Sequence, residues 1–317
     1  MSYYVKPTSD IFIKYFFGKE ENKPILLEFI NAVLIKTGID RIISVDIKNP
    51  FNLKDFSNDK ETVVDVKAVD ENGRIYDIEV QSSGNQTFIL RSLYYWSVLY
   101  SSQLKDNQIY KSLKPTICIN ILDFEVFKEL TDYFSCFVLK EKTNNHILTD
   151  QLMINYIEMP KFKNFDENDK LSKLIYFLKN EGREDNMLKT LIQEDTILNK
   201  MHNEYIRFTD DDKMRNLYDS RQKYIKDKAS ELYEAKNEGK LEGKLEGKLE
   251  GKLEGKLEGK LEEKQTTLLK QMNKKFGLTD NEKAIISRCS DLNKLDLALE
   301  DILFIEEKNK ILESLKS

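Results

Sequence analysis

Histidine and cysteine are scarce in this chain of 317 residues, which has two histidines and three cysteines. Cys118, Cys136 and Cys289 are scattered and show no spacing typical of metal ligands, so they indicate a reduced, intracellular protein without a disulfide framework. The two histidines also stand alone, and a lone histidine is more often a surface or core residue than a ligand. The sequence therefore offers no metal site built from histidine or cysteine.

Long hydrophobic runs are missing too, since no segment approaches the length of a membrane span and no signal peptide opens the chain. We therefore expect a cytoplasmic protein with no membrane partner. An excess of basic residues is also absent, because the net charge is −5 and residues 1–125 are close to neutral. Phosphate neutralisation dominates nucleic-acid binding, so this charge predicts that any binding to DNA is weak and sensitive to salt.

Two hydrophobic stretches on either side of a tight turn carry most of the chemical information. Residues 63–69 and 74–81 flank a turn in which Asn72-Gly73 tolerates positive φ, and this pattern predicts an antiparallel hairpin. Side chains alternate along a strand, so the hairpin separates into two faces. One face is apolar and holds Val64, Val66, Ala68, Tyr76, Ile78 and Val80. The other face is polar and holds Asp65, Lys67, Asp77, Glu79 and Gln81.

A divalent cation would explain the acids on the polar face. Asp65 and Glu79 are placed to approach each other across the hairpin, and two carboxylates suit Mg²⁺ or Mn²⁺. The spacing alone leaves an alternative open, in which the hairpin is amphipathic and its acids and Lys67 simply face water.

Asp65, followed after thirteen residues by Glu79-Val80-Gln81, resembles the Asp…Glu-x-Lys signature of the PD-(D/E)XK nuclease superfamily, with glutamine at the lysine position. Further blocks in the same order along the chain resemble its recombination-promoting nuclease (Rpn) and transposase branch. These blocks are Ser9–Gly18, Leu26–Leu34, Arg91–Trp96 and Leu113–Ile117.

The resemblance implies an α/β fold with a PD-(D/E)XK restriction-endonuclease-like core, in which helices flank a mixed sheet. Besides the hairpin, hydrophobic patterning predicts helices at 26–35 and 86–104, strands at 42–47 and 116–122, and edge strands at 133–140 and 153–157. The expected organisation is a core at 1–160, a helical extension at 161–238, a repeat linker at 239–263 and a small helical C-terminal domain at 264–317. Within the extension, amphipathic patterns predict helices at 171–179, 187–202 and 213–236 that pack against the core.

Tandem Gly-Lys-Leu-Glu tetrads fill the expected linker. Each interior glycine costs about 1 kcal/mol relative to alanine in a helix, and the four-residue period stacks like charges at i and i+4. The leucines also advance by about 40° per tetrad, so they do not form one seam. We therefore expect a marginal helix or an extended linker. The C-terminal domain is small for independent stability, so we expect it to bury its remaining apolar surface by self-association, as a homodimer, or by docking on the core.

The resemblance implies that Asp65 and Glu79, with the Val80 carbonyl, bind Mg²⁺, with Mn²⁺ or Ca²⁺ as alternatives. Such an ion polarises the scissile phosphate and activates a bound water. Gln81 is uncharged, which leaves the general base unassigned. Lys67 on the same face is a candidate substitute, and a solvated lysine is the alternative.

Other residues have alternative roles in the resembled site. Glu28 and Asp10 match acids near the first helix of the family, and they either reach a second metal ion or stabilise the helix end. Asp77 is a weaker candidate ligand. The aromatic residues 94–96 either stack on bases or pack in the core.

Two functions follow from these expectations. The first is a metal-dependent DNA endonuclease, a Mg²⁺-dependent deoxyribonuclease that hydrolyses phosphodiester bonds with low sequence specificity in DNA recombination, mobile elements or defence. The alternative is a catalytically impaired nuclease fold that serves as a DNA- or protein-binding module. Asp65 and Glu79 favour the first function, whereas Gln81 and the acidic net charge favour the second.

Overall fold

The structure is a computed structural model, and it describes residues 3–49, 65–84 and 86–316, with Asp65 described by its backbone alone. The chain divides into two compact units, Met1–Ile225 and Lys226–Ser317. The first unit contains the sheet and the candidate site.

A mixed sheet of six strands, in the order β1-β2-β3-β4-β6-β5, forms the centre of the first unit among the described residues. β3, β4 and β6 run parallel to one another, and the pairs β1–β2, β2–β3 and β5–β6 are antiparallel. The order helix, three strands, helix, strand expected for the core is confirmed. The strands are β1 (Val45–Ile47), β2 (Asp65–Asp70), β3 (Ile75–Gln81), β4 (Thr116–Leu122), β5 (Phe134–Val138) and β6 (Leu152–Glu158).

One expected edge strand is a central strand. β6 lies between β4 and β5, and all seven of its residues are buried. Apart from Asn155 and Glu158, its sequence is apolar on both faces because helices cover the sheet on both sides, a pattern typical of parallel strands inside an α/β sheet. The buried strand predicted at 116–122 is confirmed as β4.

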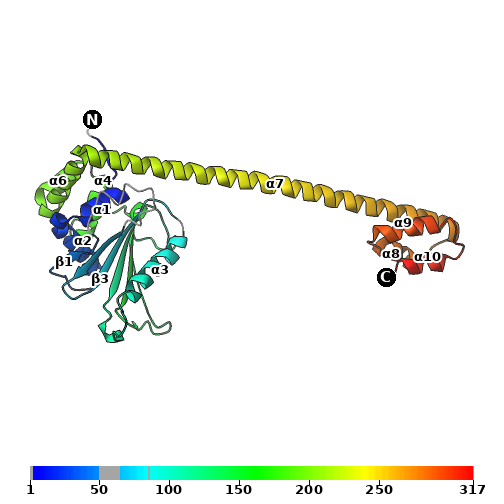
Figure 1. Cartoon of the computed structure of the whole chain (residues 1–317), viewed down its shortest axis with the longest axis horizontal. Helices are drawn as coiled ribbons and strands as arrows, with labels where there is room; N and C mark the ends of the chain where they lie inside the picture. The colour runs from blue at the N-terminus through cyan, green and yellow to red at the C-terminus, as the bar shows by residue number, and fades with distance from the viewer. Residues whose placement is uncertain (1–2, 50–64, 85, 317) are drawn as a thin grey trace. The chain divides into compact units, whose positions relative to one another are not determined.

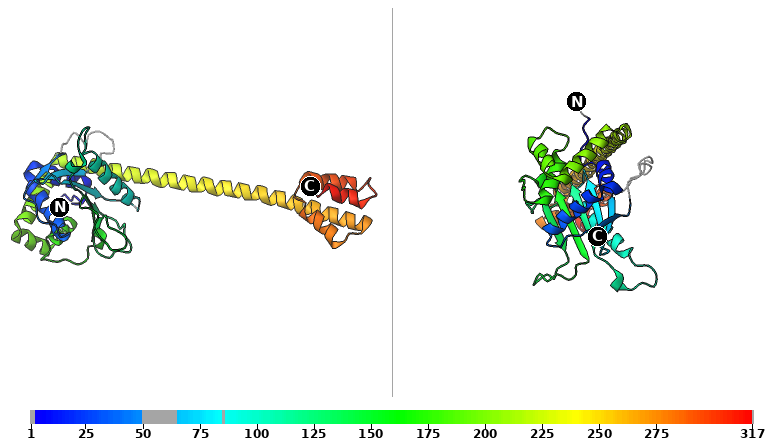
Figure 2. Two further views of the ribbon diagram at one scale, coloured as in Figure 1. Left: turned by 90° about the horizontal axis from the view of Figure 1, so that it is seen from below. Right: turned by 90° about the vertical axis from the view of Figure 1, so that its left-hand side faces the viewer.

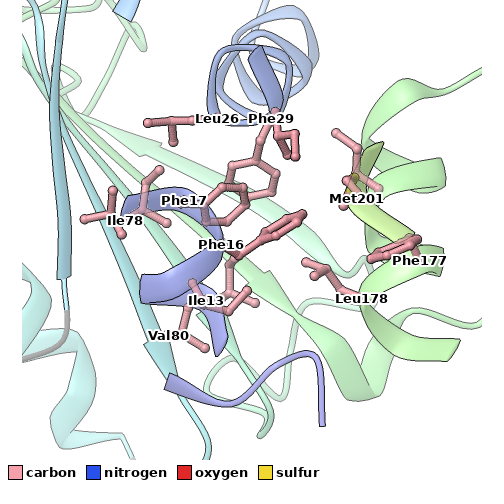
Figure 3. Packing of buried hydrophobic residues seen from close by; sticks show 14 of the residues in the cluster. Ile13, Phe16, Phe17, Leu26, Phe29, Ile78, Val80, Phe177, Leu178 and Met201 are labelled. Atoms are coloured by element: carbon pink, nitrogen blue, oxygen red, sulfur yellow. The ribbon is translucent and has the colours of Figure 1, made fainter. Parts of the chain in front are cut away.

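Helices on one face of the sheet bury the larger part of the core (Figure 1). Figure 3 shows Ile13, Phe16 and Phe17 of α1 packed between the sheet and residues from the helices that follow it. The helices of the extension therefore pack against the core, through α1 and α2, which lie between them and the sheet. The helices are α1 (Asp10–Gly18), α2 (Lys23–Lys36), α4 (Lys170–Asn180), α5 (Asn186–Glu194) and α6 (Thr196–Asp210). The single helix expected at 187–202 is two helices, because the Asp195 carboxylate caps a new helix start.

Helix α3 (Thr87–Ser101) covers the opposite face of the sheet (Figure 1). Its Phe88 packs with Cys118, Leu122 and Tyr156 in a separate apolar cluster. Its Trp96 packs against the same cluster, and the indole N–H donates to the Thr116 carbonyl at 2.9 Å. This helix thus packs over β4 and β6, on the same face of the sheet as the polar residues of the hairpin.

The Gly-Lys-Leu-Glu repeat lies within α7 (Asp212–Phe276), which continues as a helix without a break (Figure 2). Of the two expectations for the repeat, the helix is the one observed. Three of the four residues in each tetrad, lysine, leucine and glutamate, are strong helix formers, and their propensity outweighs one glycine. The leucines of the first five tetrads, from Leu241 to Leu257, are 55–62% exposed, so this part of the repeat has no buried face in the described structure. Leu261 in the last tetrad is half-buried against the core of the second unit.

The second unit has its own small core. The end of α7 packs with α8 (Asp280–Arg288), α9 (Leu292–Asp301) and α10 (Lys308–Ser314) around Leu268, Ile286 and Leu295. Homodimerisation through this region remains a prediction. None of the described helices is both long and apolar enough to cross a bilayer.

The repeat glycines predict a gain in stability on substitution. Alanine at Gly243 and Gly247 is expected to raise the helix content and to favour the helix by about 1 kcal/mol per site, because an added Cβ there meets no atom within 4 Å. Circular dichroism with thermal unfolding measures this gain. Gly182→Ala provides the contrast, because Gly182 has φ +81° and its added Cβ would collide with the Tyr205 hydroxyl. That variant should melt earlier, and equal effects at both kinds of site would contradict the explanation.

A buried carboxylate predicts a pH dependence of stability. Burial raises the pKa of Glu181 above its usual 4.5, and His202, with Nδ1 2.9 Å from the carboxylate, only partly opposes this. The folded-state pKa exceeds the unfolded one, so the ionised group destabilises the fold above the folded-state pKa, and this cost disappears as the pH falls towards 4.5. Glu181→Gln should therefore unfold at higher urea concentration than the wild type at pH 8 but not at pH 4. The exposed neighbour variant Glu184→Gln should track the wild type at both.

Candidate active site

The β2–β3 ladder pairs the residues that the sequence assigned to each face. Asp65 lies opposite Glu79, and Lys67 lies opposite Asp77. The turn has Gly73 at φ +81°, as expected from the Asn72-Gly73 pair. On the apolar face, Val66, Ala68, Tyr76, Ile78 and Val80 are all buried against α1 and its neighbours.

Two acids of the polar face are buried as well, whereas Lys67 and Gln81 on the same face are half-buried. Asp77 is 1% exposed and Glu79 is 2% exposed. These two acids therefore do not face water, which removes the alternative of a solvated amphipathic hairpin for them. Burying carboxylates is costly unless they are hydrogen-bonded, paired or bound to a cation, so this burial needs a chemical explanation.

Two amides accompany Glu79. The Gln81 side chain lies on the same face and donates from Nε2 to the Glu79 carboxylate at 3.0 Å. Asn120 of β4 lies beside Glu79 in the parallel ladder and is 1% exposed. Its Nδ2 donates to the Asn155 carbonyl at 3.1 Å, and its Oδ1 has no hydrogen-bond partner among the described residues. A buried acceptor of this kind is typical of a site that binds water or an ion.

The backbone carbonyl of Val80 points to the β2 side of β3. The Ile75 N–H donates to the segment that leads into β4, and the Gln81 carbonyl accepts from the Asp123 N–H at 3.0 Å, so both groups face β4. Backbone groups of successive strand residues point to alternate sides. The Val80 carbonyl therefore faces the edge of the ladder at which Asp65 begins β2.

The acids of the first two helices are held elsewhere. The Glu28 carboxylate accepts from Arg41 at 2.7 Å and lies 3.8 Å from the Lys170 ammonium. Asp10 accepts from the Arg221 guanidinium at 2.7 Å and from the N–H of the next residue at 2.8 Å. Both belong to the helices on the face opposite Glu79, and the structure does not bring them together with it. The position of Asp10 in the first turn of α1 fits the alternative role of stabilising a helix end.

The aromatic residues 94–96 have divided roles. Trp96 packs in the apolar cluster under α3, whereas Tyr94 is 64% exposed. The core interpretation therefore holds for Trp96 and not for Tyr94.

The residues at the β2–β3 seam fit a hard divalent cation. Positions 65 and 79 supply carboxylates, Val80 supplies a carbonyl and Asn120 supplies a buried acceptor, and Mg²⁺, Mn²⁺ and Ca²⁺ all prefer oxygen ligands. Within the described part of the chain, which excludes the Asp65 carboxylate, no three His, Cys, Asp or Glu side chains form a metal-binding group. The metal site is thus a prediction that rests on register and donor chemistry.

A family model described as PD-(D/E)XK nuclease family transposase matches residues 7–235. The chain belongs to this family. The match confirms the resemblance and the fold expected from it, and it extends beyond the expected core through the helices α4 to α6. No curated protein and no solved structure matches the chain. Membership of the family supports a nuclease- or transposase-like function with DNA as the substrate.

Asn120 is the site residue that sequence reasoning missed. Its only signal is an amide in the middle of the otherwise apolar run from Ile117 to Leu122. Its importance appears only once β4 lies beside Glu79, because that neighbour comes from a distant part of the chain.

Replacing Asn120 with leucine is expected to leave the free energy of unfolding unchanged within about 1 kcal/mol or to raise it. The substitution removes one hydrogen bond, but it also removes a buried acceptor without a partner among the described residues, and the two effects oppose each other. Urea unfolding measures the result. A loss of more than about 3 kcal/mol would mean that Asn120 is a structural residue of the sheet.

Proposed function

We propose that this protein is a metal-dependent DNA endonuclease of low sequence specificity that acts in DNA recombination, mobile elements or defence. The observation that carries the proposal is the pairing of Asp65 with Glu79 at the seam of β2 and β3, with the Val80 carbonyl turned to the same seam. Family membership supports the nuclease class, and the buried state of Glu79 supports a functional use of its charge.

The side chains of the polar face divide the work in this proposal. Asp65, Glu79 and the Val80 carbonyl would hold Mg²⁺, with Mn²⁺ or Ca²⁺ as alternatives. The bound ion supplies Lewis acidity to the scissile phosphate and acidifies a water molecule. Gln81 orients the Glu79 carboxylate through its 3.0 Å hydrogen bond, and Asn120 offers its buried Oδ1 to a water beside it.

Proton transfer cannot be assigned to Gln81, because an amide has no useful basicity. Lys67 shares the polar face and lies opposite Asp77, so we assign to it the role that lysine has in the superfamily signature. Glu28 and Asp10 remain proposals for a second ion, and their partners Arg41 and Arg221 would have to be displaced first.

A catalytically impaired binding module is the second candidate. The observation that favours it is Gln81, which fills the lysine position and is engaged with Glu79 instead of carrying a charge. Cleavage assays separate the two candidates.

Supercoiled plasmid incubated with the full chain and Mg²⁺, Mn²⁺ or Ca²⁺ is expected to be nicked and linearised. Asp65→Ala and Glu79→Ala should each lower the rate by at least about 100-fold, since loss of a direct ligand exceeds the 10- to 100-fold cost of losing an outer partner. Asp40→Ala, which removes an exposed carboxylate from the loop after α2, serves as the matched control and should cleave like the wild type. Sequencing of the cut ends tests the specificity, because low specificity predicts scattered positions.

Calorimetric titration of the same variants with Mn²⁺ measures ion binding at the site independently of DNA cleavage. Binding by the wild type and by Asp40→Ala, but not by Glu79→Ala, supports the proposed ligands. Equal cleavage by all variants would show that the activity comes from another site or a contaminant. DNA binding without cleavage in any of the three ions would overturn the endonuclease and favour the binding module.

A further inference from the structure

A cleft of about 330 Å³ opens at the edge of the sheet where β4 and β6 end. Four segments far apart in the sequence line it: the stretch before α1, the residue after β4, the turn after β6 and the end of α4. The residues that matter for the argument are Lys6, Thr8, Asp123, Pro160, Lys179 and Arg183.

Positive charge dominates the cleft, with three cations and one carboxylate, in a chain whose net charge is −5. Lys6 pairs with Asp123, and Lys179 donates to the Phe162 carbonyl at 2.6 Å. The exposed Arg183 side chain makes no ion pair or hydrogen bond with any described residue. A guanidinium that is available in this way presents a planar fork that matches two oxygens of a phosphate.

The cleft lies on the same edge of the sheet as the candidate metal ligands. β3, β4 and β6 are parallel, so their ends meet at one edge, and antiparallel β2 begins there with Asp65. The Asp123 N–H donates to the Gln81 carbonyl at 3.0 Å, and the Gln81 side chain donates to Glu79 at 3.0 Å. Two hydrogen bonds therefore connect the cleft with Glu79.

The separation suits phosphates a few nucleotides apart on one nucleic-acid strand. Adjacent strands of a sheet are roughly 4.8 Å apart, so the ends of β3 and β6 are separated by about 10 Å. Phosphates of one strand of a duplex rise about 3.4 Å per nucleotide along the axis and also wind around it, so a direct distance of about 10 Å spans at most about three nucleotides.

A buried ion pair holds the edge in shape. Glu158, at the end of β6, accepts hydrogen bonds from the N–H groups of Val126 and Phe127 in the loop after β4. Its carboxylate is 1% exposed and pairs with Lys161, whose side chain is 7% exposed and also donates to the Phe127 carbonyl. The loop that begins with Asp123 is thus fixed from inside the protein, as a preformed binding surface requires.

We propose that this cleft binds an internal backbone phosphate of the DNA strand, within about three nucleotides of the scissile phosphate at the proposed metal site. The inference rests on the proposed function, because it takes DNA as the ligand of this edge. Arg183 contacts the phosphate oxygens directly, and Lys6 adds a second charge when the phosphate replaces Asp123 as its partner.

The test measures DNA binding in the full-length Glu79→Ala background, so that no cutting interferes. Fluorescence anisotropy with a labelled duplex over a range of NaCl concentrations gives the slope of log K against log salt. Arg183→Gln is expected to reduce the magnitude of this slope by about 0.9, the contribution of one phosphate contact to duplex DNA. Arg183→Lys, which keeps the charge, should retain the slope while it weakens binding, because the bidentate contact is lost.

Lys142→Gln is the matched control. It removes one exposed positive charge from the connection between β5 and β6, at the opposite edge of the sheet, and should leave the slope unchanged. Equal slopes for Arg183→Gln and Lys142→Gln, or no DNA binding at all, would overturn the inference. If Arg183→Gln reduces the slope only with 5′-phosphorylated DNA, the cleft binds a strand-end phosphate, and the assignment to an internal phosphate is overturned. If the slope changes as expected but the wild type does not cleave plasmid, the proposed endonuclease activity is overturned, whereas the proposed phosphate site in the cleft stands.

Discussion

The register between β2 and β3 determines what the rest of the first unit can be. Side chains alternate in a strand, so a slip by one residue would turn Tyr76 and Ile78 towards α3 and would drive Asp77 and Glu79 into the aromatic core around α1. The observed register keeps the apolar set with Phe16 and Phe17, and it sets Asp65 opposite Glu79. Burial of the apolar face therefore fixes the positions of the acids. The proposed metal site thus depends on the same register that packs the core.

Much of this arrangement is local and could be predicted. Alternation in residues 63–69 and 74–81, with Asn72-Gly73 between them, was enough to predict the hairpin and both faces. The environment of the acids could not be predicted in the same way. Glu79 lies beside Asn120 of β4, and this pairing joins distant segments of the chain, which explains why the solvated face remained open and why Asn120 was missed.

Two other differences have physical causes that short windows of sequence do not contain. β6 was expected at an edge because an apolar run does not reveal how many neighbours it has. The helix expected at 187–202 divides at Asp195, where capping competes with a continuous amphipathic pattern. In the repeat, the choice between helix and linker depended on weighing glycine against three good helix formers, and α7 shows which contribution is larger.

The carboxylate of Glu158 and the ammonium of Lys161 are shielded from solvent, and mobile ions screen such a pair far less than they screen charges at a surface. Of the cleft cations, in contrast, Arg183 is exposed and Lys6 and Lys179 are only half-buried. A high salt concentration would therefore release a bound polyanion, while the sheet edge that Glu158 and Lys161 hold keeps its shape. The protein can thus release its ligand and bind it again without refolding this edge.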